Sequence, residues 1–95
     1  MQEDIKDTEL YRGKLKDRIL RNLYREWLEV VAERETPELD YDLKMAVWDV
    51  PKQIMMRVIQ EMVDEGWLKD MVGIVTLTAE GRKECKRRKL DKKFR

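Results

Sequence analysis

Apolar residues recur at helical spacing early in the chain. From Leu15 to Arg34 they return every three or four residues, which predicts a long amphipathic helix. These positions span an arc of about 220° when counted at 100° per residue, whereas a helix that covers one core needs an apolar stripe of about 100° or slightly more. We expect a second copy of the chain to cover the excess, because most homo-oligomers are two-fold dimers. The chain's own terminal segments are the alternative cover.

The apolar stripe of this helix supplies the expected dimer interface. Its members have large apolar side chains, and they are Leu20, Tyr24, Trp27, Leu28 and Val31. The other tryptophans, Trp48 and Trp67, are expected to anchor the core or an interface rather than to bind a ligand, since aromatic side chains dominate the energetics of both.

Prolines and a glycine divide the middle of the chain into shorter elements. Thr36 is a good N-cap and Pro37 suits a first helical turn, so we expect a boundary there. A short helix follows from about Asp42 to Trp48. It ends before Pro51, because the residue that precedes a proline is pushed out of the α region.

The next apolar pattern predicts a helix over Pro51–Glu65, which Gly66 ends by supplying a left-handed backbone position. The face that this helix is expected to bury contains Ile54, Met55, Val58, Ile59, Met62 and Val63. Its opposite face is polar and is expected to remain exposed.

Two short β-branched segments come next. The segments Trp67–Lys69 and Ile74–Leu77, with Gly73 between them, predict a hairpin. Thr78 is expected to cap a last helix that runs from Ala79 to about Leu90, with an acidic residue in its first turn that suits the helix dipole. The predicted fold class is therefore mainly α with a small β-hairpin.

The order of these elements resembles a winged helix-turn-helix. Counted from Val50, apolar residues and a glycine fall at +5 (Met55), +9 (Ile59), +12 (Met62) and +16 (Gly66), followed by Trp67-Leu68. Winged-helix regulators of the MarR and PadR kind have the similar register V-x(4)-apolar-x(3)-L-x(2)-L-x(3)-G-apolar. The segment VTLTAEGRKECKRR also resembles their LT-x-E-G passage from wing strand into final helix. The resemblance covers about residues 15–90 and implies a three-helix core, a wing and a C-terminal helix.

One position departs from that pattern. Ala46 lies four residues before Val50, where these families more often place a small residue five before. The turn between the two helices is therefore expected to differ from theirs, or the helix boundary to lie slightly elsewhere.

Composition narrows the chemistry. Charged residues make up 43% of the chain, with no His and no Ser, and only one Cys and one Asn. The usual Cys/His zinc site and the Ser-His-Asp and Cys-His arrangements are thereby excluded. Carboxylates are plentiful, so composition alone leaves an enzyme open, but no phosphate loop, nucleotide fingerprint or nucleophile elbow appears. We therefore expect neither an enzyme nor a bound cofactor. Abundant Glu, Lys and Arg resemble a thermophile's composition. We expect Cys85 to be an ordinary, partly buried thiol, and its basic neighbours make a redox sensor the alternative.

Charge is distributed unevenly along the chain. Residues 82–95 contain nine Lys or Arg and two Asp or Glu, a net charge of +7, whereas residues 1–81 carry −6. We expect one winged-helix domain over 1–95, with an N-terminal extension at 1–14 and a basic C-terminal tail at 86–95. The tail suits an anionic partner, and a solvated tail without a partner is the alternative.

The resemblance implies that the helix over 51–65 is a recognition helix that reads duplex DNA in the major groove. Arg57 can pair with guanine, Gln53 or Gln60 with adenine, and Met56 can contact a thymine methyl group. Glu61 and Asp64 repel phosphate, so the C-terminal half should tilt away. The residues expected at the DNA are Lys52, Gln53, Met56, Arg57, Gln60, Lys69, Lys86, Arg87 and Arg88.

The wing favours a second interpretation. Its tip, Asp70–Gly73, has no basic residue and contains Met71 and Val72, which suits a protein partner better than phosphate. The alternative function is therefore a winged-helix adaptor that binds protein. No apolar run approaches 18 residues and the N-terminus lacks an apolar signal core, so we expect a cytoplasmic protein that does not span a membrane.

Overall fold

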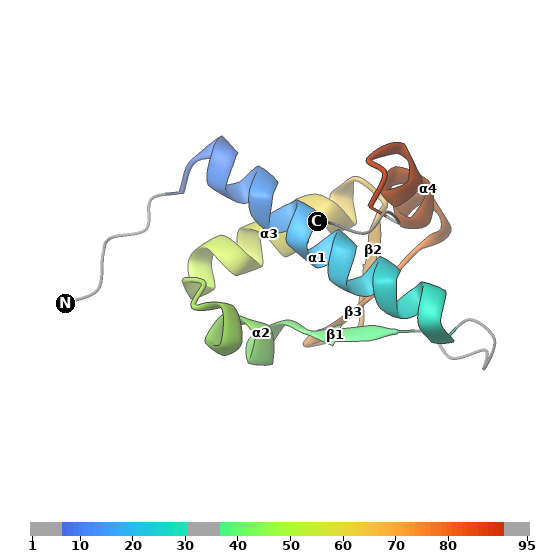
Figure 1. The fold of residues 1–95 in the computed structure, drawn as a ribbon. Coiled ribbons are helices and arrows are strands. Elements are labelled where there is room, and N and C mark those ends of the chain that lie inside the picture. The colour runs from blue at the N-terminus through green and yellow to red at the C-terminus, as the bar shows by residue number, and fades with distance from the viewer. Residues whose placement is uncertain (1–6, 31–36, 91–95) are drawn as a thin grey trace.

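The computed structural model describes residues 7–30 and 37–90, and within them helices alternate with three short strands (Figure 1). In chain order the elements are α1 (Glu9–Val30), β1 (Glu38–Asp40), α2 (Tyr41–Trp48), α3 (Lys52–Asp64), β2 (Leu68–Asp70), β3 (Ile74–Leu77) and α4 (Ala79–Arg87). The described part of the chain is mainly helical with a small antiparallel sheet, as the hydrophobic pattern predicts.

Side-chain oxygens begin three of the helices. The Thr8 hydroxyl accepts a hydrogen bond from the Tyr11 N–H at 3.1 Å, so α1 begins at Glu9 rather than near Leu15. The Asp40 carboxylate accepts from the Leu43 N–H at 3.1 Å and caps α2. Thr78 caps α4 as predicted, accepting from the Gly81 N–H at 2.9 Å.

The predicted boundary at Thr36-Pro37 does not begin a helix. Thr36 lies outside the described residues, and Pro37 is buried just before β1. Strand β1 was not predicted, because Leu39 between two acidic residues is too short a pattern to indicate a strand. It forms because Leu39 pairs opposite Val75 and is buried against the core.

The sheet has β3 at its centre, in the order β1-β3-β2 with both pairs antiparallel. The predicted hairpin is confirmed, with Leu68 opposite Leu77. At its turn, Val72 and Gly73 have φ of 57° and 91°, and the Met71 N–H donates to the Ile74 carbonyl at 2.7 Å. Two successive left-handed residues match the twist of a tight hairpin, but a β-branched residue is rarely found in that conformation.

The core lies where α1, α3, α4 and β3 meet, and Figure 1 shows α1 running across α3. The five predicted residues of α3 that are fully buried are Ile54, Met55, Val58, Ile59 and Met62, and Val63 is partly buried. Gly66 adopts φ of 85°, as a left-handed helix stop requires.

The same packing corrects the expected dimer interface. Leu20 and Tyr24 are 0% and 3% exposed within a single chain, so they belong to its core and are closed to a second copy. Trp27 is partly buried against that core, whereas Leu28 is 47% exposed. Val31 lies outside the described residues. The apolar excess of α1 is therefore covered largely by the chain's own β3, α3 and α4.

The structure also corrects the borders predicted for the N-terminal extension at 1–14 and the basic C-terminal tail at 86–95. Residues 9–14 belong to α1 rather than to an extension. At the other end, Arg88 ends α4 and forms ion pairs with Asp17 of α1 and with Glu84, while Leu90 is 4% exposed within the core. Residues 86–90 are thus part of the folded domain rather than a tail.

Cys85 lies in the core instead of on a reactive surface. It is 0% exposed, and its thiol lies 3.8 Å from the Leu20 carbonyl, to which it donates. Burial raises the pKa of the Cys85 thiol to about 12. A redox sensor needs an accessible thiolate, so that interpretation of Cys85 is wrong.

Candidate nucleic-acid interface

The turn between α2 and α3 sets which face of α3 is exposed. Asp49 ends α2 with φ of 57°, and the N–H of the buried Val50 donates to the Met45 carbonyl at 3.0 Å. Pro51 then begins α3 without a side-chain cap. With one face of α3 buried on α1, the opposite face is presented outward.

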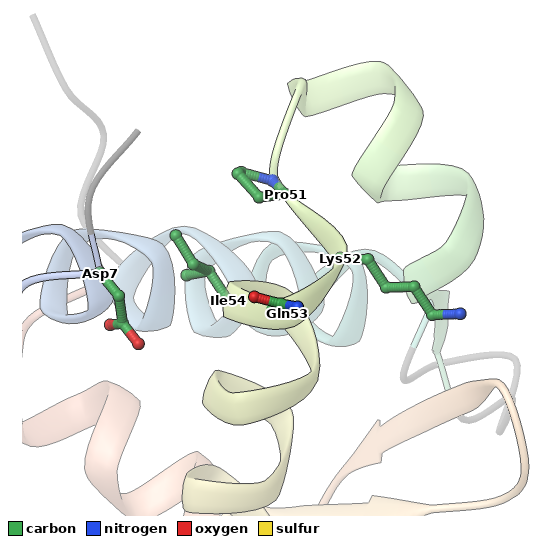
Figure 2. A pocket seen from close by; sticks show the side chains of 5 residues that line it. All are labelled: Asp7, Pro51, Lys52, Gln53 and Ile54. Carbon is green, nitrogen blue, oxygen red and sulfur yellow. The ribbon is translucent and has the colours of Figure 1, made fainter. Parts of the chain in front are cut away.

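The first turn of α3 presents polar side chains. Lys52 and Gln53 are exposed, whereas Ile54 is 4% exposed. Lys52, Gln53 and Asp7 line a cavity of about 450 Å³. In Figure 2, Gln53 lies between Asp7 and Lys52, and the Lys52 side chain points away from Asp7. Met56, one turn further, is 39% exposed. Lys52, Gln53 and Met56 are three of the residues predicted to contact DNA, and all three side chains are exposed in the structure.

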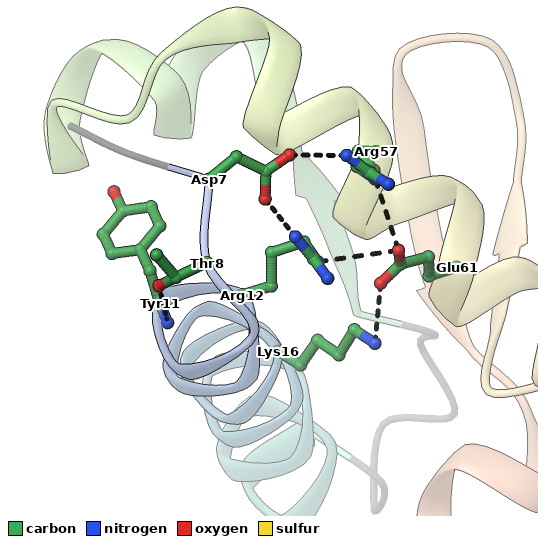
Figure 3. A network of polar contacts seen from close by, with 7 residues as sticks. All are labelled: Asp7, Thr8, Tyr11, Arg12, Lys16, Arg57 and Glu61. Atoms are coloured by element: carbon green, nitrogen blue, oxygen red, sulfur yellow. Dashed lines mark hydrogen bonds and ion pairs between the residues drawn. The ribbon is translucent and has the colours of Figure 1, made fainter.

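Arg57 is outward but already paired. Its Nη1 lies 2.7 Å from Asp7 Oδ2, and its Nε lies 3.6 Å from Glu61 Oε2 (Figure 3). Asp7 also accepts a hydrogen bond from Arg12 of α1. The guanidinium of Arg57 is therefore engaged with two carboxylates rather than free to pair with guanine.

Two further cations of α1 complete this network. Lys16 Nζ lies 2.8 Å from Glu61 Oε1, and Arg12 Nε lies 3.6 Å from Glu61 Oε2. The hydrogen bond from Arg12 holds the pKa of Asp7 below its usual value, and Arg57 adds to this effect. The hydrogen bond from Lys16 likewise lowers the pKa of Glu61. Both carboxylates are therefore ionised at neutral pH.

The C-terminal half of the exposed face is also closed by carboxylates. The Gln60 side-chain amide donates to Asp64 Oδ1 at 2.9 Å, so its donor is satisfied within the helix. The predicted contact from Gln60 to adenine would require this bond to break. The structure thus leaves only the N-terminal half of α3 open.

The hairpin and its surroundings are acidic and apolar. Lys69 is exposed on β2, but residues 38–78, which include α2 and α3 as well as the sheet, contain four Lys or Arg and eight Asp or Glu, a net charge of −4. At the tip, Met71 is 50% exposed and Val72 is 96% exposed. Lys69 is therefore poorly placed to bind phosphate, because the residues around it are acidic or apolar.

The basic residues of α4 are not brought to the first turn of α3. In Figure 1, α4 and the first turn of α3 lie at opposite ends of the view. Arg87 and Arg88 both form ion pairs with Glu84, and the guanidinium of Arg88 lies 4.9 Å from the Trp67 ring centroid. Lys86 is exposed beside a cavity of about 280 Å³ between α1 and α4. These three predicted contacts therefore do not extend the surface of α3.

Sequence reasoning missed the contribution of α1 to this site. Asp7, Arg12 and Lys16 reach α3 from a segment about fifty residues earlier, and a charged residue on a helix gives no signal of a partner so distant in sequence.

Comparison of the chain with protein-family models, with curated proteins and with solved structures found no match. Over residues 7–30 and 37–90, no helix has the length and apolar character to cross a membrane. Within the same ranges, no three His, Cys, Asp or Glu side chains gather in a group that could hold a metal ion.

Proposed function

We propose that this protein is a winged helix-turn-helix protein that binds duplex DNA and acts as a transcriptional regulator, with α3 as its recognition helix. The order of elements and the strand order β1-β3-β2 support this topology. The observation that carries the proposal is the first half of α3, where Lys52, Gln53 and Met56 face outward while the opposite face is buried on α1.

Each of these three side chains has a role that suits a base edge or a phosphate. Gln53 can donate to and accept from adenine, and Met56 can contact the thymine methyl group. Lys52 can bind a backbone phosphate together with the N–H groups of the uncapped first turn of α3. Affinity should fall steeply with salt, since each phosphate contact releases counterions.

Titration of fluorescently labelled duplexes at about 50 mM and 200 mM salt tests this proposal. We expect Lys52→Ala to weaken binding to all sequences alike, and Gln53→Ala to reduce discrimination among sequences by about 1–3 kcal/mol. Lys83→Ala, an exposed change on α4, is the control and should leave discrimination unchanged. If no duplex binds at the lower salt concentration, the proposal is wrong.

A second function, a protein-binding adaptor, is supported by the exposed apolar residues of α2 and the hairpin. Leu43 and Val47 lie one turn apart on α2 and are 57% and 63% exposed. The hairpin turn is held beside α2, because the Tyr41 N–H donates to the Gly73 carbonyl at 3.3 Å and the Gly73 N–H donates to the Tyr41 hydroxyl at 3.2 Å. An apolar cleft on a partner protein would bury this surface.

A photoreactive residue at position 72 tests the adaptor function in cells, with the same residue at position 83 as the control. A protein crosslinked from position 72 only, and lost when Leu43→Glu is added, would favour the adaptor over the regulator. Equal crosslinking from both positions would argue against a specific partner at the hairpin.

A further inference from the structure

Two arginines from different helices converge on a single carboxylate at the exposed face of α3. Arg57 Nη1 lies 2.7 Å from Asp7 Oδ2, and Arg12 donates to Asp7 Oδ1, so each oxygen of Asp7 is bound by one guanidinium (Figure 3). The side chain of Arg57 is 58% exposed and that of Asp7 is 29% exposed, which leaves the pair open to an exchanging anion.

This arrangement suits a phosphate as well as it suits a carboxylate. A phosphodiester presents two unesterified oxygens, and guanidinium groups bind such paired oxygens with directional, charge-assisted hydrogen bonds. Because a carboxylate presents the same paired anionic oxygens, the side chain of Asp7 occupies the position that a phosphate would take between Arg12 and Arg57.

Neighbouring charges keep the two arginines in position when Asp7 leaves. Glu61 lies 3.6 Å from both guanidinium groups and is itself held by Lys16 at 2.8 Å. Without Asp7 the cations Arg12, Lys16 and Arg57 would face two carboxylates, Glu61 and Glu9, of which Glu9 acts on Arg12 alone, and the cluster would keep a net positive charge. The vacated position would therefore attract a new anion rather than collapse onto Glu61.

The cluster also lies next to the surface proposed to meet DNA. Arg57 is one helical turn beyond Gln53, and Asp7 lines the same cavity as Lys52 and Gln53 (Figure 2). An anion at Asp7 repels a phosphate backbone that approaches this surface. DNA can use Arg57 only after Asp7 has moved.

We propose that Arg12 and Arg57 form a phosphate-binding site that Asp7 occupies in the free protein and that a backbone phosphate takes over when duplex DNA binds. This inference rests on the proposed function, and it assigns Arg57 to phosphate rather than to guanine. Asp7 then acts as an internal competitor that weakens binding to every sequence alike.

The test replaces the competitor in the full chain with Asp7→Asn and measures two quantities. The first is the Kd for a labelled duplex at about 50 mM salt, which we expect to fall about two- to tenfold, the range that loss of one or two partly exposed ion pairs allows. The second is the response of the Arg12 and Arg57 side-chain NMR signals to inorganic phosphate without DNA. We expect Asp7→Asn to respond at a lower phosphate concentration than the unmodified chain.

Asp64→Asn is the matched control, because Asp64 is another carboxylate on α3 but is bonded to Gln60 rather than to an arginine. It removes the same charge and should leave the response of Arg12 and Arg57 to phosphate unchanged. In Asp7→Asn, the further change Arg57→Gln should abolish the gain in duplex affinity. Circular dichroism at matched temperatures checks that each variant is folded.

The outcomes separate this site from the proposed function. The competitor role of Asp7 is overturned if Arg12 and Arg57 in Asp7→Asn respond to phosphate no better than in the unmodified chain. It is also overturned if Asp64→Asn improves their response to phosphate as much as Asp7→Asn does. If the arginines of Asp7→Asn respond to phosphate but no variant binds duplex, the anion site stands while the proposed function fails. If neither phosphate nor duplex binds, both proposals fail.

Discussion

At the scale of single residues, two helical glycines have opposite surroundings. A Cβ added to Gly81 in α4 would lie 2.3 Å from the Trp67 carbonyl oxygen and 2.7 Å from Leu77 Cδ1. A Cβ added to Gly13 in α1 would meet no heavy atom within 4 Å. Gly81 thus allows α4 to approach β3 and the backbone of Trp67 closely, whereas Gly13 contributes only backbone freedom.

We predict opposite effects of alanine at these two positions. Gly81→Ala should lower the free energy of unfolding by roughly 1–3 kcal/mol, because the methyl group overlaps a backbone oxygen that cannot turn aside. Gly13→Ala should raise it by about 0.5–1 kcal/mol, because alanine loses less conformational entropy in a helix. Urea denaturation measures both, and a Gly81→Ala variant as stable as the original would contradict the packing described here.

Val72 has a backbone conformation that is unfavourable for its side chain. Its φ of 57° is unfavourable for a β-branched residue, and its side chain is 96% exposed, so packing does not offset the strain. Val72→Asn should therefore raise the free energy of unfolding by about 1 kcal/mol, since Asn-Gly suits this turn. Met71→Asn, next to it but outside the left-handed region, is the control and should show no such gain in thermal or urea denaturation.

At the scale of elements, α4 is tied to α1 through Arg88, whose guanidinium Glu84 holds in position. The Glu84 carboxylate accepts from Arg87 Nε at 3.0 Å and from Arg88 Nε at 2.6 Å, and Arg88 also binds Asp17 of α1. The hydrogen bond from Arg87, with that from Arg88, lowers the pKa of Glu84 from its ordinary 4.5 to about 2. Because the folded state lowers this pKa, the stabilisation is fully present above about pH 4.5 and is lost as pH falls towards 2.

Glu84→Gln should therefore be less stable than the original chain at neutral pH, by about 1–3 kcal/mol. The difference in free energy of unfolding should shrink as pH falls from 4.5 towards 2, where Glu84 itself becomes protonated. Urea denaturation across this range measures it, and a difference independent of pH would mean that the Glu84 carboxylate does not stabilise α4 by its charge.

The hydrophobic pattern predicted some of these elements and missed others. Helix α3, its buried face, the stop at Gly66 and the cap at Thr78 were predicted, because each depends on residues within about one helical turn of each other. Strand β1 and the first two turns of α1 were not. Their apolar residues are few, and β1 is stabilised by pairing with β3, which lies far along the chain.

At the scale of the whole molecule, the surface of α1 decides whether two copies can associate. With Leu20 and Tyr24 in the core, the homodimer stays a prediction that rests on Leu28, 47% exposed, beside the partly buried Trp27. Sedimentation equilibrium should show a dimer for the original chain and a monomer for Leu28→Asp. The matched change Leu10→Asp, at the other end of α1, should leave the dimer intact. A monomer at every concentration of the original chain would contradict the prediction.

The sequence alone determined the helices and the hairpin, because their periodicity, caps and glycine stops act over a few neighbouring residues. It also located the exposed face of α3 at Gln53, Met56, Arg57 and Gln60, with Lys52 at the entry turn. Only the tertiary structure decided that Leu20 and Tyr24 are core residues, that α4 lies away from the first turn of α3, and that Asp7 holds Arg57. Burial and ion pairing depend on which distant segments meet, and a local pattern carries no information about a partner fifty residues away.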